Sequence, residues 1–309
     1  MPKINKINKM NKMNKNFIKY AIDKSLQQVY KYGRRSPNRV KYIHYWIRNY
    51  VQNRLGNNYR CYSYNPLSVK DNKEIKVAGK FYSKNSDITI CNNEEKILGV
   101  ISVKFILSNY KQNSNNYFES MIGECYNLKA NGIKYGHIMI CPLNIPYYDI
   151  NSKLKKIETL KSNDIMKYTE LNNSNIVNKP DMLSFNILDI KTDEGVIPNP
   201  DLFKKLNAQK QDNILDNIKN KCELLNDQKI NKTFDFTTSQ YLVNNSIIKS
   251  LNNYMDTIEK DYTQYQSVNT NNNNNNNNIL DTRYNKRKKT SKNNINHSLF
   301  EKLIKKIKK

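Results

Sequence analysis

Residues 87–105 read DITICNNEEKILGVISVKF and contain the strongest strand signals of the chain. Two strand-like segments, at 87–90 and 97–105, flank the polar turn Asn92-Asn93-Glu94-Glu95, and this pattern predicts a β-hairpin. The second segment is apolar almost without interruption around Val100-Ile101, which is typical of a strand buried on both faces. We therefore expect the hairpin to lie inside a mixed sheet.

The segments on either side of the hairpin extend this sheet and cover it. Apolar residues at helical spacing predict amphipathic helices at 18–30 and 40–51, with a break at Gly33 and Pro37. Downstream, the pattern predicts a helix at 116–131 and strands at 135–141 and 182–190, followed by helical segments at 201–225 and near 240–260. The fold class expected is α/β, with a mixed central β-sheet flanked by helices.

The two ends of the chain have a composition that cannot bury a core. Residues 4–15 repeat an apolar-Asn-Lys triplet, a period that matches neither helix nor strand, and 271–278 is an unbroken asparagine run. We expect disordered basic termini and the following division: a basic arm at 1–15, an α/β domain at 16–262, an Asn-rich low-complexity linker at 263–298, and a basic amphipathic tail at 299–309.

The charge of the chain points to a polyanionic partner. Lys and Arg number 52 against 27 Asp and Glu, which gives a net charge of +25. An AT-rich coding bias explains part of the lysine content but not the pair Arg34-Arg35. Phosphate neutralisation supplies most non-specific affinity for nucleic acid, so we expect a DNA-binding protein in which Arg34 and Arg35 contact the nucleic acid.

Several classes of protein are disfavoured by what the sequence lacks. It contains no apolar run long enough for a membrane span and no apolar core of a signal peptide. The five cysteines form no CxxC pair. This spacing and the lack of a signal peptide together predict an intracellular protein, cytoplasmic or nuclear, with reduced thiols. Three histidines are too few and too dispersed to suggest a zinc site. No glycine pattern for ATP or NAD is present.

The residues that could carry chemistry lie in and after the hairpin. Asp87 stands at the entry of the first strand, and Ser102 and Lys104 share one face of the returning strand. The helix that follows carries Glu119 and Glu124. Carboxylate oxygens are the ligands that Mg²⁺ prefers, and a lysine can stabilise charge on a phosphate or orient the attacking water. This set suits metal-dependent phosphodiester cleavage.

Asp87, then Ser102-Val103-Lys104 after a hairpin, then a helix with Glu119, resembles the PD-(D/E)xK nuclease superfamily. Ser102 stands where the motif has an acidic residue, and Ser86 where it has proline, which is similar to the SxK variant among type II restriction endonucleases. The resemblance implies a restriction-endonuclease-like core and Mg²⁺-dependent cleavage of double-stranded DNA by a homodimer. It also implies that Asp87 and Glu119 bind metal and that Lys104 assists the water.

The position of the second carboxylate stays open. Glu119 and Glu124 are five residues apart and point about 140° apart on a helix, at roughly 100° per residue, so only one faces the site. Glu119 follows Lys104 at a spacing close to the variant motif, which favours it; Glu124 is the alternative, and Glu74 upstream is a third candidate.

A more literal match to the motif occurs later in the chain. Pro180-Asp181 is followed by Asp189-Ile190-Lys191, but 182–190 contains no turn residue and is predicted to be one strand. At ~3.3 Å per residue the two aspartates would lie about 26 Å apart and could not share a metal.

Three other functions remain compatible with the sequence. The first is a non-catalytic nucleic-acid-binding protein on a degenerate nuclease core. The second is a structure-specific DNA repair or recombination nuclease. The third is an interaction protein whose charge reflects composition alone.

Overall fold

The computed structural model describes residues 18–33, 36–66, 73–151, 153–190, 203–218, 222–225 and 247–287. The chain forms two compact units, which divide after Lys260. The expected basic arm at 1–15, the tail at 299–309 and the pair Arg34-Arg35 lie outside the described residues.

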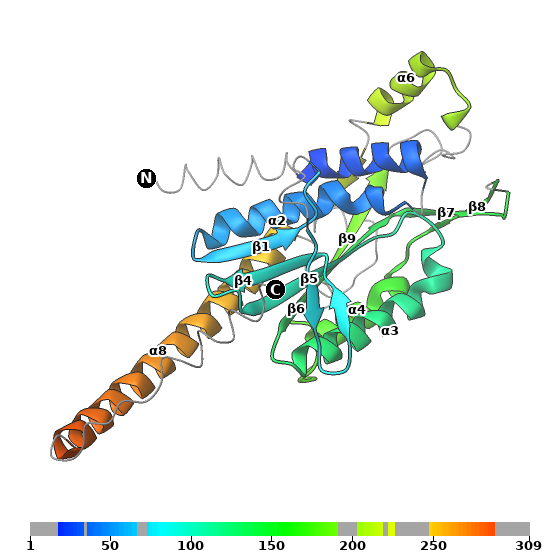
Figure 1. The fold of residues 1–309 in the computed structure, drawn as a ribbon. Helices are drawn as coiled ribbons and strands as arrows, with labels where there is room; N and C mark the ends of the chain where they lie inside the picture. The colour runs from blue at the N-terminus through cyan, green and yellow to red at the C-terminus, as the bar shows by residue number, and fades with distance from the viewer. Residues whose placement is uncertain are drawn as a thin grey trace, which may run out of the picture. The chain divides into compact units, whose positions relative to one another are not determined.

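A mixed six-stranded sheet forms the centre of the first unit (Figure 1). Its order is β1 (Tyr59–Ser63), β4 (Ile88–Asn92), β5 (Ile97–Phe105), β6 (Lys134–Pro142), β9 (Met182–Ile190) and β10 (Cys222–Leu224). The strands β1, β4 and β5 pair antiparallel, β5, β6 and β9 pair parallel, and β10 pairs antiparallel with β9. The predicted α/β class and the β4–β5 hairpin are therefore confirmed.

Helices and two small sheets surround this centre. A helix at 18–32 and the short η1 (Pro37–Val40) precede α2 (Lys41–Leu55), and α3 (Tyr110–Lys129) connects β5 to β6. The remaining helices are α4 (Ser162–Asn173), α6 (Ala208–Ile218) and α8 (Ile247–Arg287). The small antiparallel pairs are β2 (Lys76–Ala78) with β3 (Ser83–Asn85), and β7 (Asn144–Tyr148) with β8 (Leu154–Thr159). Within the described part of the chain, none of these helices combines the length and apolar character that a membrane span requires.

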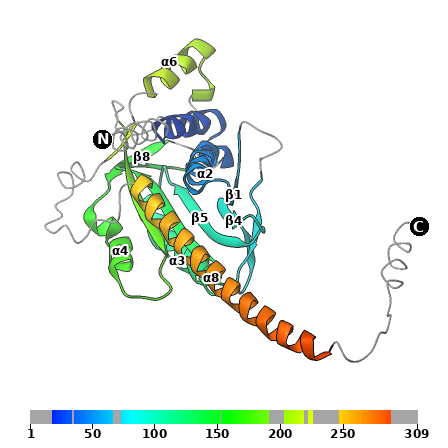
Figure 2. The same ribbon diagram turned by 90° about the vertical axis from the view of Figure 1, so that its left-hand side faces the viewer.

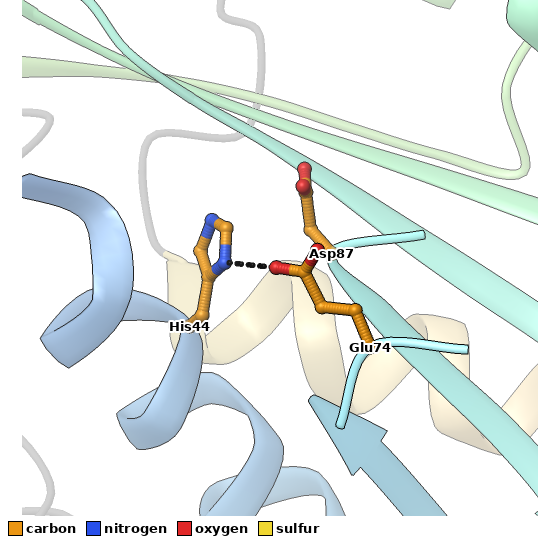
Figure 3. Close-up of side chains that lie close together, drawn as sticks. All are labelled: His44, Glu74 and Asp87. Carbon is orange, nitrogen blue, oxygen red and sulfur yellow. Dashed lines mark ion pairs between the residues drawn. The ribbon is translucent and has the colours of Figure 1, made fainter. Parts of the chain in front are cut away.

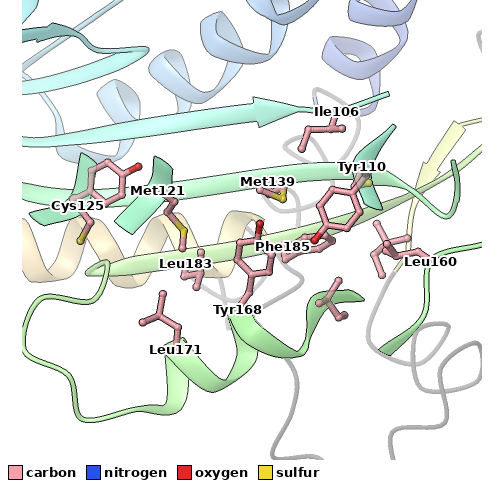
Figure 4. Close-up of a cluster of buried hydrophobic side chains, with 14 of the residues drawn as sticks. Ile106, Tyr110, Met121, Cys125, Met139, Leu160, Tyr168, Leu171, Leu183 and Phe185 are labelled. Atoms are coloured by element: carbon pink, nitrogen blue, oxygen red, sulfur yellow. The ribbon is translucent and has the colours of Figure 1, made fainter. Parts of the chain in front are cut away.

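One face of the sheet packs against α3 and α4. Met139 on β6 and Phe185 on β9 meet Met121 of α3 and Tyr168 and Leu171 of α4 in a single buried cluster (Figure 4). The ring of Tyr168 lies 5.3 Å from that of Phe185, centroid to centroid. Burial of each such side chain is worth roughly 1.5–3 kcal/mol, so this cluster fixes α3, and with it the helical carboxylates, against the sheet.

The opposite face of the sheet packs against the first turns of α8 (Figure 2). Gly99 and Gly136 leave the space that this helix fills, because a Cβ at Gly99 would lie 2.6 Å from the Tyr254 hydroxyl oxygen. That hydroxyl lies 2.9 Å from the carbonyl oxygens of both Val100 and Lys134. The central strands β5 and β6 are therefore covered on both faces, as their apolar sequences predicted.

Three predicted elements differ from the structure. The helix expected from 116 begins at Tyr110, because the polar residues of its first turns face outward and give no apolar signal. Within 201–225, only 208–218 forms an α-helix of length, and Cys222–Leu224 is a strand because it pairs with the open edge of β9. The backbone of α8 remains helical through Asn271–Asn278, where composition predicts a linker. Asparagine costs under about 0.7 kcal/mol per residue in a helix, and elongation from a formed helix avoids the cost of nucleation.

Candidate metal centre

The carboxylate of Asp87 is held at the point where β4 begins. The pairing of β4 with β5 starts at Ile88 and Ile101, so the amide of Val103 lies beyond the end of the ladder. Asp87 Oδ2 accepts a hydrogen bond from this amide at 2.7 Å and a longer one from the Ser102 hydroxyl at 3.4 Å. The carboxylate thus accepts the hydrogen bond that a backbone carbonyl would accept if the ladder continued past Ile88. Its other oxygen, Oδ1, has no hydrogen-bond partner among the described residues.

Two further metal-ligating side chains lie beside Asp87. His44 of α2 and Glu74, which precedes β2, each offer a ligand atom, and these atoms and a carboxylate oxygen of Asp87 all lie within 4.8 Å of one another (Figure 3). The His44 Nδ1 atom lies 3.6 Å from Glu74 Oε1. The histidine belongs to the buried face of α2, while Glu74 is exposed and Asp87 is half-buried.

The donors of this cluster fit a divalent cation. His44 is only 3 % exposed, yet neither of its ring nitrogens has a hydrogen-bond partner among the described residues. Leaving a buried polar group unsatisfied costs about 1–3 kcal/mol, a cost that a bound cation would offset at His44. The two carboxylates suit both Mg²⁺ and Mn²⁺. The imidazole favours transition metals such as Mn²⁺ over Mg²⁺. The three residues form a candidate metal centre.

A cavity of about 860 Å³ opens beside this centre. His44, Asp87 and Lys104 line it, so the structure brings together the aspartate and the lysine of the predicted motif. Its other walls come from η1, the start of α3, the tip of the β7–β8 hairpin and Lys204. Gly33 and Ser36 also line the cavity; Arg34 and Arg35, between them, are not described.

On its other side Asp87 meets a closed polar network. The ammonium of Lys84 on β3 forms an ion pair with Glu124 of α3. The Tyr135 hydroxyl donates to Glu124 Oε2 at 3.0 Å and lies 3.0 Å from Nδ1 of His137, its neighbour on the same face of β6. The pocket left among Asp87, Ser102 and this network measures about 10 Å³, which leaves room for no more than one water molecule.

Burial determines the charge states of this network. It lowers the pKa of Lys84 to about 8, with the positive charge of Lys104 acting in the same direction and the carboxylate of Asp87 opposing it. It also lowers the pKa of His137 to about 3, again with help from Lys104 and Lys84. His137 is therefore neutral at physiological pH. The charges of Lys84 and Lys104 are close enough to repel one another.

The structure separates the two glutamates of α3. Glu119 is exposed, lines neither of the spaces around Asp87, and its charge acts on Lys167 of α4. Glu124 is 12 % exposed and lines the small pocket beside Asp87. The placement therefore favours Glu74 and Glu124 over Glu119, because the apolar residues of α3 orient its Glu119 side towards α4 rather than towards Asp87.

Asp181, in the more literal motif match, has a different role. β9 runs without a break from Met182 to Ile190, as predicted, so Asp181 and Asp189 stand at opposite ends of one strand. The Asp181 carboxylate lies 3.0 Å from the Lys129 ammonium and accepts a hydrogen bond from the Tyr135 amide at 2.9 Å. Its charge is compensated within the fold, which indicates a structural aspartate.

His44 is the site residue that sequence reasoning missed. It lies within the apolar stripe that predicts the helix at 40–51, and three dispersed histidines do not suggest a zinc site. The signal available was a titratable side chain on a face otherwise filled by residues such as Ile43 and Ile47. Its partners, Glu74 and Asp87, come from separate segments and converge only in the folded chain.

The chain matches no protein-family model, no curated protein and no solved structure.

Proposed function

We propose that this protein is a divalent-metal-dependent endonuclease that cleaves double-stranded DNA, of the PD-(D/E)xK type and most similar in motif to type II restriction endonucleases. One observation carries the proposal. Asp87, Glu74 and His44 offer converging ligand atoms, and Lys104 lines the same cavity as Asp87 and His44. An endonuclease needs these parts in this proximity, and the motif at 87–104 supplies the aspartate and the lysine.

Each residue has a defined task in this proposal. Asp87 and Glu74 would hold the metal through carboxylate oxygens, and His44 would supply a further ligand where Ser102 replaces the acidic residue of the motif. A bound Mg²⁺ or Mn²⁺ supplies positive charge where negative charge develops on the phosphate. The Val103 amide and the Ser102 hydroxyl fix one oxygen of Asp87, and the other is available to a ligand. The Lys104 ammonium would orient the attacking water or stabilise the phosphate.

The composition of the chain supports DNA as the substrate. A net charge of +25 favours a polyanion, and the sequence contains the arginine pair Arg34-Arg35. Cleavage of both strands requires two sites, which a two-fold homodimer would provide on a two-fold DNA sequence.

The direct test is plasmid cleavage with Mg²⁺, with Mn²⁺ and with chelator. We expect discrete, metal-dependent fragments from the intact protein and at least about 100-fold less cleavage from Asp87→Ala and Lys104→Ala. Glu119→Ala is the matched control, because it removes a carboxylate of α3 that lies away from the cavity. Cleavage that persists in Asp87→Ala would contradict the proposal.

A second candidate function is DNA binding without cleavage. It is favoured by Ser102, which provides no carboxylate at the motif position, and by Lys84, which already neutralises Glu124. This candidate predicts tight, salt-sensitive binding and intact plasmid with every divalent metal tested.

A further inference from the structure

Arg39 of η1 lines the cavity that Asp87 and Lys104 also line. Its Nε atom donates to the carbonyl of Phe105 at 3.4 Å, and Nη1 donates to the carbonyl of Ser36 at 3.1 Å. Both acceptors are neutral backbone groups. No carboxylate among the described residues forms an ion pair with this arginine.

This leaves a half-buried charge without a counter-ion. Burial lowers the pKa of Arg39, and the nearby Tyr117 hydroxyl opposes this only in part. A charge taken out of water costs free energy unless an opposite charge compensates it. Two acids line the cavity: Asp87, whose carboxylate is assigned to the metal, and Asp149, whose carboxylate accepts a hydrogen bond from the Lys153 amide at 2.7 Å. Neither forms an ion pair with Arg39, so the cavity has room for an anion beside this cation.

Other arginines of the fold are compensated or lie elsewhere. Arg54 pairs with Asp256 and Glu259, and Arg60 pairs with Glu95. Arg48, on α2, resembles Arg39 in being half-buried and in donating Nε to a backbone carbonyl, that of Cys61, at 3.0 Å. It does not line the cavity, which makes it a matched control for the loss of a partly buried guanidinium.

We infer that Arg39 binds a phosphate group of the nucleic acid, next to the phosphate that lies between Asp87 and Lys104. The two backbone contacts hold the guanidinium plane in place, and Nη2 has no hydrogen-bond partner among the described residues, so it can donate to a ligand together with the second hydrogen of Nη1. A planar pair of N–H donors matches two oxygens of a phosphate. That the phosphate belongs to DNA rests on the proposed function; that the site takes a phosphate anion does not.

The test measures the affinity of a labelled DNA duplex in chelator, over a series of salt concentrations. We expect Arg39→Ala to weaken binding about ten- to a hundredfold and to reduce the salt slope by about one. Arg39→Lys keeps the charge and the slope but loses much of the affinity, because an ammonium cannot make the paired contact. Arg48→Ala binds as the intact protein does. Affinity and slope in Arg39→Ala equal to those of the intact protein would overturn the inference.

Two further measurements separate the possible outcomes. Inorganic phosphate should raise the melting temperature of the intact protein and not that of Arg39→Ala. If phosphate raises the melting temperature but Arg39→Ala leaves DNA affinity unchanged, Arg39 binds a free anion, and the assignment to nucleic acid is overturned. Arg39-dependent binding without metal-dependent cleavage would sustain the inference and sink the endonuclease. If cleavage and DNA affinity are lost in Asp87→Ala but unchanged in Arg39→Ala, the endonuclease proposal is supported and the inference about Arg39 is contradicted. Arg39→Gln serves if Arg39→Ala fails to fold.

Discussion

The two sides of Asp87 differ in how their polar groups are satisfied. On the closed side, Lys84 neutralises Glu124, and the Tyr135 hydroxyl bridges Glu124 and Nδ1 of His137, whose Nε2 is the one ring nitrogen there without a hydrogen bond from the described residues. On the open side, both ring nitrogens of His44 lack hydrogen bonds within the described residues, and no carboxylate of those residues pairs with Arg39. Both sides contain cations and potential metal ligands, so composition alone does not distinguish them.

Polar groups without hydrogen-bond partners indicate where a ligand would bind. A network that compensates its own charges gains nothing from a further ion and contributes to the stability of the fold. Buried groups that lack a hydrogen bond cost free energy, which a bound ligand can offset. We therefore propose that metal and substrate bind on the open side and that the closed side contributes to the stability of the fold.

The largest effect is expected at Asp87 itself. Asp87→Asn keeps an oxygen that can accept from the Val103 amide but removes the charge that the metal needs. DNA cleavage should fall at least about 100-fold, measured as the rate of plasmid nicking at saturating Mn²⁺, with the melting temperature close to that of the intact protein. A rate within threefold of the intact protein would contradict the role of Asp87.

The next effect concerns His44 and has opposite signs with and without metal. His44→Leu removes an imidazole that is buried without hydrogen bonds, so the metal-free protein should become more stable by about 1 kcal/mol. The same variant should lose most of the rise in melting temperature that Mn²⁺ causes in the intact protein. Thermal unfolding with and without Mn²⁺ measures both. A variant that is less stable and still responds fully to Mn²⁺ would show that His44 is only a core residue.

Breaking the closed network should change stability and not cleavage. Glu124→Gln leaves the Lys84 ammonium without its partner and should destabilise the protein by about 1–3 kcal/mol in urea unfolding. Cleavage should stay within about threefold of the intact protein at a temperature where both are folded. If Glu124→Gln loses cleavage but keeps full stability, Glu124 would be a metal ligand. The motif would then take the form in which the helix after the hairpin supplies the second carboxylate.

The closed network also predicts a dependence of stability on pH. Burial depresses the pKa of His137 to about 3, far below the value of about 6.5 in an unfolded chain. The unfolded state therefore takes up a proton below pH 6.5 while the folded state does not. Stability is fully present above pH 6.5 and is lost as the pH falls, by about 1.4 kcal/mol per pH unit from this residue.

Urea unfolding between pH 7 and pH 5, before most carboxylates titrate, measures this slope. His137→Gln should flatten it relative to the intact protein. An unchanged slope in that variant would mean that His137 takes up its proton in the folded state as readily as in the unfolded one.

The smallest effect is expected at Glu119. Its side chain is exposed on α3, so Glu119→Gln should change the free energy of unfolding by less than about 0.5 kcal/mol and leave cleavage unchanged. Loss of metal-dependent cleavage in Glu119→Gln would restore the spacing-based assignment that the geometry disfavours.

The sequence predicted the centre of the fold well because its signals are local. Apolar runs and a polar turn at 87–105 specify the hairpin, and the strands at 135–141 and 182–190 are equally continuous. The peripheral pairs β2–β3 and β7–β8 were not predicted. β8 is largely exposed and rich in lysine, and β7 contains Pro146, so neither shows the alternation that indicates a strand.

The site was predictable only where the chain itself brings residues together. Asp87, Ser102 and Lys104 lie on one hairpin, so their proximity follows from strand pairing. The choice between Glu119 and Glu124 depends on how α3 is rotated by its packing against β6 and α4, which spacing along the chain does not determine. His44 reaches the site from a separate helix, and that convergence is a property of tertiary packing.

The most direct test of the division between the two sides is calorimetric titration of the protein with Mn²⁺ alone, in the absence of DNA. The intact protein and Glu124→Gln should bind one ion per chain with similar affinity, while Asp87→Asn and Glu74→Gln should bind at least about tenfold more weakly. Weakened binding in Glu124→Gln with full affinity in Glu74→Gln, or no binding by the intact protein, would contradict the assignment of the metal to the open side of Asp87.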